Sequence, residues 1–386
     1  MAIKHEVSER FFGLPSSEFS EILRIAEEDK SIISLGPGEP DFVTPKHIRD
    51  FAKKMLDKGY THYSPPGGRK DLKESIVKKL KKENGIKVDV DEIVVTVGSQ
   101  EALHLAFEAT LDPGESVLVP NPGFLSYIPM IETLTANPIS VPLSEGEGFE
   151  YNPDVVKKLV DERTRVLLIN TPSNPTGRIL KRKTLEEIAD IANENDLTIF
   201  SDEAYEKLVY GKNKHISIGS LNGMENKVVS FFTFSKTYAM PGFRIGFAAG
   251  PKEIIQAMTR LHVYTTVCAP TVSQMAAKFA LESSQKPVAA MLKEYDKRRK
   301  LVIKRLNEME NVSCLEPEGA FYAFLNIKNV GMNSVDFGHF LLKKAKVLVV
   351  PGTEFGKYGE GYVRLSYARG YGEIEVALDR IAKVLR

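Results

Sequence analysis

The chain has 386 residues, of which 42% are hydrophobic and 27% charged, and its formal net charge is only +1. This length predicts a larger domain with a smaller companion rather than one small core. Interspersed charges of both signs exclude a general electrostatic attraction for nucleic acid or an anionic membrane, and two cysteines cannot build a disulfide framework.

Targeting, membrane and metal signals are missing from the sequence. No run of apolar residues approaches a membrane span, and the start, MAIKHEVSERFFGLP, lacks the apolar core of a signal peptide. We therefore expect a soluble, cytoplasmic protein. The histidines show no metal-binding spacing, so no metal is expected. The densest basic run, KRRK at 297–300, is interpreted as the exposed face of a helix.

The middle of the chain alternates between short β-branched runs and helical patterns. After an N-terminal helical stretch and an irregular Gly/Pro segment, strands are predicted at 93–97, 116–120, 166–170, 198–201, 228–232 and 245–249. Helices are predicted between them, among others at 100–110 and 184–195. Thr184 and Glu187 have the spacing of a capping box, which predicts a helix start there. Buried strands separated by helices indicate a mainly parallel sheet flanked by helices.

The pattern changes near residue 282. A charged helix is predicted at 285–307, short strands at 320–325 and 347–350, and a last helix at 373–385. We expect a large α/β domain at 47–281. A small α+β domain would be built from both chain ends, 1–46 and 282–386.

Polar residues follow the predicted strands with unusual regularity. The strand ends lead into Gly98-Ser99-Gln100, into NPTG at 174–177, into DEAY at 202–205 and into Thr233-Phe-Ser-Lys236, and Arg244 comes eight residues later. In open parallel sheets, ligands bind at the carboxyl ends of the strands. The sequence therefore predicts a ligand site that contains a lysine, an acid, a phenol and a guanidinium.

Four motifs in fixed order carry a family resemblance: NPTG, DEAY, SKTYAMPGFRIG at 235–246 and YVRLSYA at 362–368. With LGPGEPDF at 35–42, they cover almost the whole chain. The chain resembles the fold-type I, class I/II pyridoxal-phosphate-dependent aminotransferases, and is most similar to the archaeal aromatic and aspartate aminotransferases. The resemblance implies pyridoxal 5'-phosphate as cofactor, amino-acid and 2-oxo-acid substrates, and a homodimer with shared active sites.

The resemblance also implies roles for individual residues. Lys236 matches the lysine that forms the Schiff base, since an imine requires a primary amine, and Asp202 matches the carboxylate that keeps the pyridine nitrogen protonated. Tyr205 and Asn174 match donors to the ring's phenolic oxygen, and Phe124 matches the aromatic that stacks on the ring. The phosphate is expected to be bound by Ser99, Gln100, Thr233, Arg244 and, from the partner subunit, Tyr63. The substrate carboxylate is expected to contact Arg364, Asn174 and the backbone of Gly38.

The side chain of the substrate is less sharply predicted. Gln100 stands where aspartate-preferring bacterial relatives commonly carry lysine, and Glu18 would oppose a second carboxylate if it flanks the pocket. Phe11, Phe12 and Leu14 would favour apolar substrates if they line it, although packing explains them equally well. We expect a ping-pong aminotransferase with aromatic or broad specificity and 2-oxoglutarate as acceptor. Aspartate aminotransferase and, further off, a carbon–sulfur lyase of the same fold are the alternatives.

A regulator built on an aminotransferase-like domain is a third class of protein with these motifs. Such a regulator needs a DNA-binding module, and the chain carries no basic arm that would serve as one. The enzymatic interpretation is therefore preferred.

Overall fold

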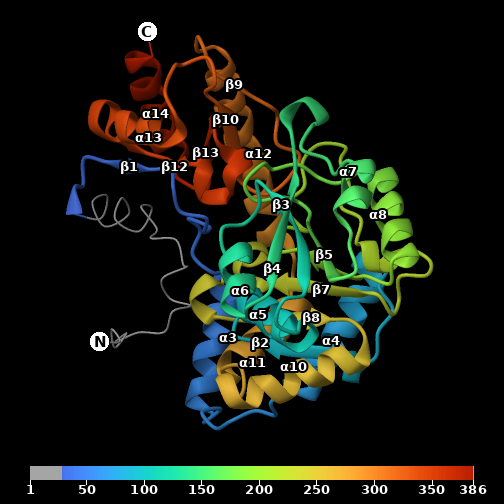
Figure 1. The fold of residues 1–386 in the computed structure, drawn as a ribbon. Helices are drawn as coiled ribbons and strands as arrows, with labels where there is room; N and C mark the ends of the chain where they lie inside the picture. Colours follow the sequence, from blue (N-terminus) through green and yellow to red (C-terminus); the bar gives the residue numbers. More distant parts are fainter. Residues whose placement is uncertain (1–27, 386) are drawn as a thin grey trace, which may run out of the picture.

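The computed structural model describes residues 28–385, so Phe11, Phe12, Leu14 and Glu18 lie outside the described residues. A seven-stranded sheet forms the centre of the molecule, in the order β2-β8-β7-β6-β5-β3-β4 (Figure 1). Only β8 runs antiparallel to its neighbours. The predicted mainly parallel sheet is therefore confirmed. Its strands are β2 (Ile93–Thr96), β3 (Ser116–Asn121), β4 (Asn137–Pro142), β5 (Thr164–Asn170), β6 (Thr198–Asp202), β7 (Val228–Thr233) and β8 (Gly246–Ala249).

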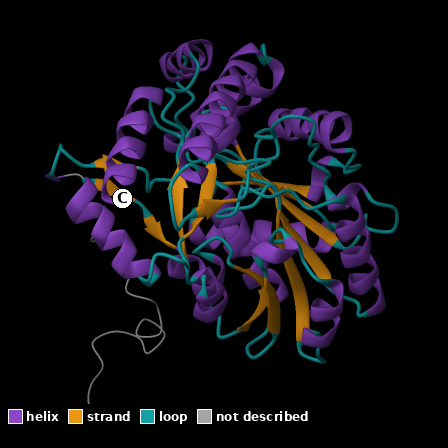
Figure 2. Cartoon of the chain, turned by 90° about the horizontal axis from the view of Figure 1, so that it is seen from above, coloured by secondary structure: helices purple, strands orange, loops and turns teal. Residues whose placement is uncertain are grey.

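Both faces of this sheet are buried, because successive side chains of each strand enter different cores. Along β5, Leu167 and Ile169 belong to one hydrophobic cluster, whereas Val166 and Leu168 belong to another. Figure 2 shows the strands enclosed by helices. The helices of this part are α3 (Lys46–Asp57), α4 (Lys70–Lys79), α5 (Ser99–Thr110), α6 (Tyr127–Thr133), α7 (Pro153–Leu159), α8 (Arg182–Glu194), α9 (Phe234–Thr237), α10 (Lys252–Thr265) and α11 (Thr271–Glu282).

A second, antiparallel sheet of four strands has the order β12-β13-β10-β9. An early and a late segment of the described residues meet beside it, because β1 pairs with β11 in parallel, and Figure 1 shows this blue segment next to the red C-terminal elements. The boundaries proposed at 46/47 and 281/282 remain a prediction. The elements are β1 (Ile33–Ser34), β9 (Ser313–Cys314), β10 (Tyr322–Asn326), β11 (Val347–Leu348), β12 (Val350–Pro351), β13 (Tyr362–Ser366), α12 (Lys286–Asn307), α13 (Ser334–Phe340) and α14 (Tyr371–Val384).

Two local predictions were wrong. The helix expected to start at Thr184 begins at Arg182, and the Thr184 hydroxyl donates to Glu150 at 2.7 Å instead of capping the helix. The basic run at 297–300 is exposed only at Lys297 and Lys300, because Arg298 and Arg299 are buried. Arg298 pairs with Asp41 at 2.8 Å, and Arg299 pairs with Asp296 at 2.8 Å.

No helix within residues 28–385 is both long enough and apolar enough to cross a lipid bilayer.

Candidate active site

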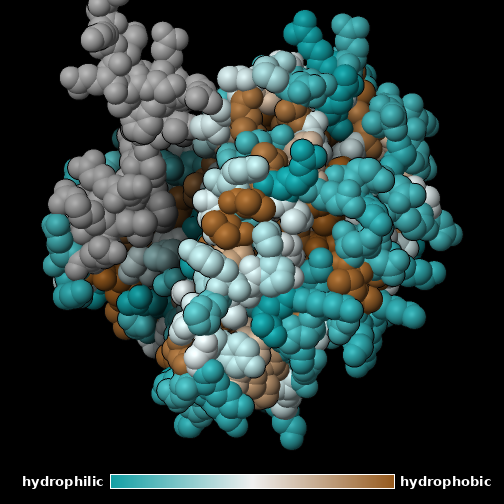
Figure 3. Space-filling model, turned by 90° about the horizontal axis from the view of Figure 1, so that it is seen from below, coloured by the Kyte–Doolittle hydropathy of each residue, from teal (hydrophilic) through white to brown (hydrophobic). Residues whose placement is uncertain are grey.

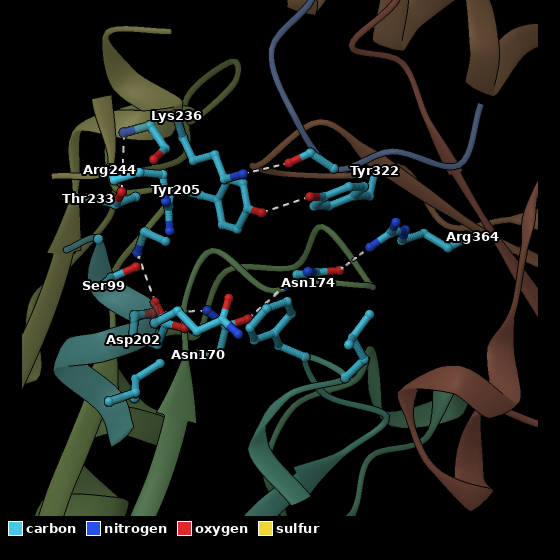
Figure 4. Close-up of a pocket in the computed structure, with 18 residues that line it drawn as sticks. Ser99, Asn170, Asn174, Asp202, Tyr205, Thr233, Lys236, Arg244, Tyr322 and Arg364 are labelled. Carbon is cyan, nitrogen blue, oxygen red and sulfur yellow. Dashed lines mark hydrogen bonds between the residues drawn. The ribbon is translucent and has the colours of Figure 1, made fainter. Parts of the chain in front are cut away.

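A cavity opens where the carboxyl ends of the central strands meet the small antiparallel sheet (Figure 4). Asn170, Asp202 and Thr233 are the last residues of β5, β6 and β7. The antiparallel direction of β8 adds Arg244 to this edge, since Arg244 precedes that strand rather than following it. The cavity brings together every predicted site residue except Tyr63: Gly38, Ser99, Gln100, Phe124, Asn174, Asp202, Tyr205, Thr233, Lys236, Arg244 and Arg364.

Lys236 lies on the short helix α9, which starts because the Thr233 hydroxyl accepts a hydrogen bond from the Ser235 amide at 3.1 Å. Its amine donates to the carbonyl of Gly38 at 2.5 Å. Burial, reinforced by the positive charge of Arg364, lowers the pKa of this amine from 10.5 to about 8. About one in ten Lys236 amines is therefore neutral and nucleophilic at pH 7, far more than for a lysine of ordinary pKa.

Asp202 is buried and receives two hydrogen bonds, from the Tyr127 hydroxyl at 2.6 Å and from the Ala204 amide at 3.1 Å. Burial raises the pKa of this carboxyl above its usual value, although both hydrogen bonds act in the opposite direction. A buried carboxylate is stabilised by a cation placed beside it. The site therefore suits a ligand with a protonated nitrogen facing Asp202.

Asn174 links two sides of the cavity. Its backbone amide donates to the side-chain oxygen of Asn170 at 2.8 Å, and its own side-chain oxygen accepts from Arg364 at 2.9 Å. Because Arg364 engages the side-chain oxygen, the Nδ2 amide of Asn174 is the group left to donate to a ligand.

Arg364 is a buried cation whose hydrogen bonds go to neutral acceptors. Besides Asn174, its guanidinium donates to the carbonyl of Gly36 at 2.6 Å, while its Nε has no partner among the described residues. Burial lowers the pKa of Arg364. A planar carboxylate would supply the missing negative charge and bind in the bidentate manner that suits arginine.

The first turn of α5 and Arg244 form a cradle for an anion. Gly98, with a φ of +82°, precedes α5, and no side chain caps that helix. A Cβ at Gly98 would lie 2.9 Å from the Arg244 guanidinium and would displace it, and the positive φ also favours glycine there. Amide groups at a helix start, a hydroxyl at Thr233 and a guanidinium are the donors that bind phosphate.

Tyr63 does not line this cavity; its side chain is 84% exposed. Phe124 does line it, and its ring meets that of Tyr127 edge-on at a centroid distance of 5.4 Å.

Four polar residues of the site were missed in the sequence: Asn170, Ser235, Tyr127 and Tyr322. Asn170 directly ends a predicted strand, so the same reasoning that selected Asp202 could have found it. Tyr127 and Tyr322 carry no comparable local signal, because buried tyrosines are common in hydrophobic cores. Among the described residues there is no group of three or more His, Cys, Asp or Glu suited to a metal ion.

Comparison with known proteins agrees with this geometry. Residues 30–381 match the family described as aminotransferase class I and II. The chain is 49% identical to an aspartate aminotransferase of Pyrococcus abyssi, with 98% of both chains covered. It is 46% identical to aromatic-amino-acid aminotransferase 2 of Thermococcus litoralis, again over 98% of each.

A solved structure gives the same result for the fold. The aromatic aminotransferase of Pyrococcus horikoshii superposes with a TM-score of 0.90 at 48% identity, covering 95% of this chain and 98% of that one. The fold, the ordered motifs and these relatives lead to one conclusion. The chain belongs to the aminotransferase class I and II family and is an enzyme of the transaminase type.

Proposed function

We propose that the enzyme uses pyridoxal 5'-phosphate to move the amino group of an L-amino acid, of aromatic or broad specificity, to a 2-oxo acid such as 2-oxoglutarate by a ping-pong mechanism. One observation carries this proposal: a buried amine of lowered pKa, Lys236, shares a cavity with a buried acid, Asp202, and a buried guanidinium, Arg364. The donor set also fits the cofactor's phosphate and protonated ring nitrogen.

When bound, the cofactor supplies an electron-accepting ring that stabilises negative charge at the substrate Cα. Asp202 would keep the ring nitrogen protonated, and Phe124 would offer an aromatic face to the ring. Tyr205 and the Nδ2 amide of Asn174 would donate to the ring's phenolic oxygen. The phosphate would be held by Ser99 and the backbone amide of Gln100 at the start of α5, together with Thr233 and Arg244.

The substrate is oriented by its carboxylate, which binds Arg364 with support from Asn174 and the Gly38 backbone. Lys236 would take the proton from the substrate Cα as a general base, and the protonated amine would then serve as the general acid. A pKa of about 8 suits both steps near neutral pH, because the amine can be present in either form.

The preference for aromatic or mixed substrates rests on the pocket lining. Gln100 is neutral and only weakly held, with its amide 3.5 Å from the Ser126 hydroxyl, and Phe124 and Leu125 add apolar surface. A second substrate carboxylate would find no lysine at position 100. The relatives named aspartate and aromatic aminotransferases keep aspartate as the main competing donor.

The test is a donor panel of Asp, Phe, Tyr, Trp, Ala and Leu with 2-oxoglutarate and added pyridoxal phosphate. We expect glutamate to accumulate with the aromatic donors, and no turnover in Lys236→Ala. Strict preference for aspartate would reject the aromatic assignment. An S-substituted cysteine added as a further substrate tests the lyase alternative. Release of a thiol, pyruvate and ammonia from it, with no glutamate formed from any donor of the panel, would reject the transaminase proposal.

We also propose that the enzyme acts in the cytoplasm as a homodimer in which Tyr63 reaches the partner's phosphate site. Tyr63 and Tyr264 are 84% and 89% exposed, and α10, which carries Tyr264, contacts the segment of Tyr63 because the His262 Nδ1 atom lies 2.8 Å from the Pro66 carbonyl oxygen. Figure 3 shows hydrophobic patches interrupting the hydrophilic surface on the face seen from below. Large exposed aromatics at one place are typical of an interface.

Subunit complementation tests the shared site. Tyr63→Ala and Lys236→Ala homodimers are each expected to be impaired. Mixed dimers should contain one site with both defects and one with neither, and so regain activity. No gain on mixing, with hybrid formation verified by native mass spectrometry, would mean that Tyr63 serves its own subunit.

A further inference from the structure

Tyr322 touches both halves of the active site. Its side chain lines the cavity and is 1% exposed, and its hydroxyl lies 2.7 Å from that of Tyr205 (Figure 4). The face of its ring lies under the Arg364 guanidinium, with 4.4 Å between the guanidinium carbon and the ring centroid. One side chain thus contacts a group expected to serve the cofactor and a group expected to serve the substrate.

The small sheet sets this position. β10 and β13 pair antiparallel, with Phe324 opposite Arg364 and Tyr322 opposite Ser366. Side chains of paired and alternate residues share one face of a sheet, so Tyr322 is the diagonal neighbour of Arg364. The register therefore places an aromatic ring beneath the guanidinium, where cation–π attraction fixes its plane.

The number of available protons decides which of the two phenol hydroxyls donates to the other. Each hydroxyl has one proton to donate. If Tyr205 donates to the ring oxygen of the cofactor, its own oxygen must accept the proton of Tyr322. A phenol that accepts a hydrogen bond becomes a stronger donor, because the two bonds polarise each other.

We propose that Tyr322 is a positioning residue with two separable actions, an inference that rests on the proposed function. Its hydroxyl strengthens Tyr205 as a donor to the cofactor, and its ring holds Arg364 in the plane that receives the substrate carboxylate. If Tyr322 only filled the core, no substitution would affect the donation by Tyr205 and the position of Arg364 independently of each other.

Two substitutions separate the actions. Tyr322→Phe removes the hydroxyl but keeps the ring under Arg364, whereas Tyr322→Leu removes both. Tyr151→Phe is the matched control, since Tyr151 is equally buried and donates to the Leu168 carbonyl at 2.8 Å, away from the cavity. Thermal unfolding of each cofactor-loaded variant verifies that it is folded.

The first readout is the pH dependence of the visible absorbance of the loaded protein. A donor to the ring oxygen stabilises its anionic form, so a weaker donor should raise the chromophore's pKa. We expect an upward shift of about half a unit or more in Tyr322→Phe. Tyr151→Phe should titrate like the wild type. A titration of Tyr322→Phe that matches the wild type would overturn the hydroxyl's role.

The second readout is the Kd of 3-phenylpropionate, a carboxylate without an amino group, measured by calorimetry. We expect Tyr322→Phe to bind within about twofold of the wild type and Tyr322→Leu to bind at least about fivefold more weakly. Equal affinities for Phe and Leu would overturn the ring's role. If wild-type protein gives no visible absorbance with pyridoxal phosphate, the proposed function itself fails, and this inference fails with it.

Discussion

Gly38→Ala should damage the active site through a single steric conflict. Gly38 has no positive φ, so alanine fits its backbone conformation, but the new Cβ would lie 2.4 Å from the Tyr322 hydroxyl. Ordinary contact begins near 3.4 Å. About 1 Å must therefore be gained by displacing either residue, and misplacement of this size in an active site costs about 100-fold in rate.

The conflict is difficult to relieve by local motion. The Tyr322 hydroxyl is held by Tyr205, and the Gly38 carbonyl accepts from Lys236 at 2.5 Å, so both residues are fixed by the groups that define the site. We expect kcat/KM to fall by about 100-fold and the free energy of unfolding by about 1–3 kcal/mol.

The double variant Gly38→Ala/Tyr322→Phe isolates the cause. Removing the hydroxyl leaves the ring carbon Cζ as the nearest atom at 3.4 Å, which is an acceptable contact. The double variant should recover most of the stability lost in Gly38→Ala, with a coupling of about 0.5–3 kcal/mol in a double-mutant cycle of thermal or urea unfolding. Wild-type kcat/KM in Gly38→Ala, or purely additive effects in the cycle, would refute the steric reasoning.

Three further predictions concern charge. Because the pKa of Lys236 is lowered to about 8 in the folded state, its charged form destabilises the cofactor-free protein below pH 8, and this destabilisation disappears by pH 10.5. Lys236→Met should therefore have a free energy of unfolding about 3 kcal/mol higher than the wild type at pH 7. In urea titrations the difference between the two proteins should close between pH 8 and 10.5. A constant gap would contradict the lowered pKa. Glu206→Gln should lower the free energy of unfolding by about 3–5 kcal/mol, because it removes the ion-pair partner of Lys79, whose side chain is only 8% exposed. Asp50→Asn, which breaks the exposed pair with Lys46, should lower it by under about 1 kcal/mol. Gln100→Lys should raise kcat/KM for aspartate relative to phenylalanine by about tenfold, since it adds a cation to the pocket; an unchanged ratio would show that position 100 does not face the substrate side chain.

The central sheet and most of the site could be predicted because their signals are local. Strands such as β5 are continuous apolar runs, and parallel strands align their carboxyl ends, so Asp202 and Thr233 were expected at one edge. Arg244 was included in the predicted site because it follows Lys236 by eight residues, and its role as a phosphate ligand came from the resemblance. Its place at this edge depends on the antiparallel direction of β8, which no local pattern of residues 245–249 reveals.

The basic run at 297–300 shows a signal that was present but not used. Met291, Tyr295, Val302 and Leu306 form the buried stripe of α12, with spacings of a helical face. Arg298 falls between Tyr295 and Val302 on that stripe, so helical periodicity indicates burial, and a buried arginine requires acidic partners. The composition of the run suggested exposure only because its register in the helix was ignored.

Tyr322 could not be found in this way, and the reason bears on how the site is held together. Phe321 next to it is equally buried, and nothing local tells the two apart; the role of Tyr322 arises from Tyr205, 117 residues away in sequence, and from the β10–β13 register. Tyr322 to Tyr205 and Arg364 to Asn174 are both hydrogen bonds that join the small sheet to the strand ends of the large one. A shift between the two sheets would therefore change the proposed ring donors and the proposed carboxylate anchor together. The contacts between the sheets thus include the same residues that are proposed to hold the cofactor and the substrate.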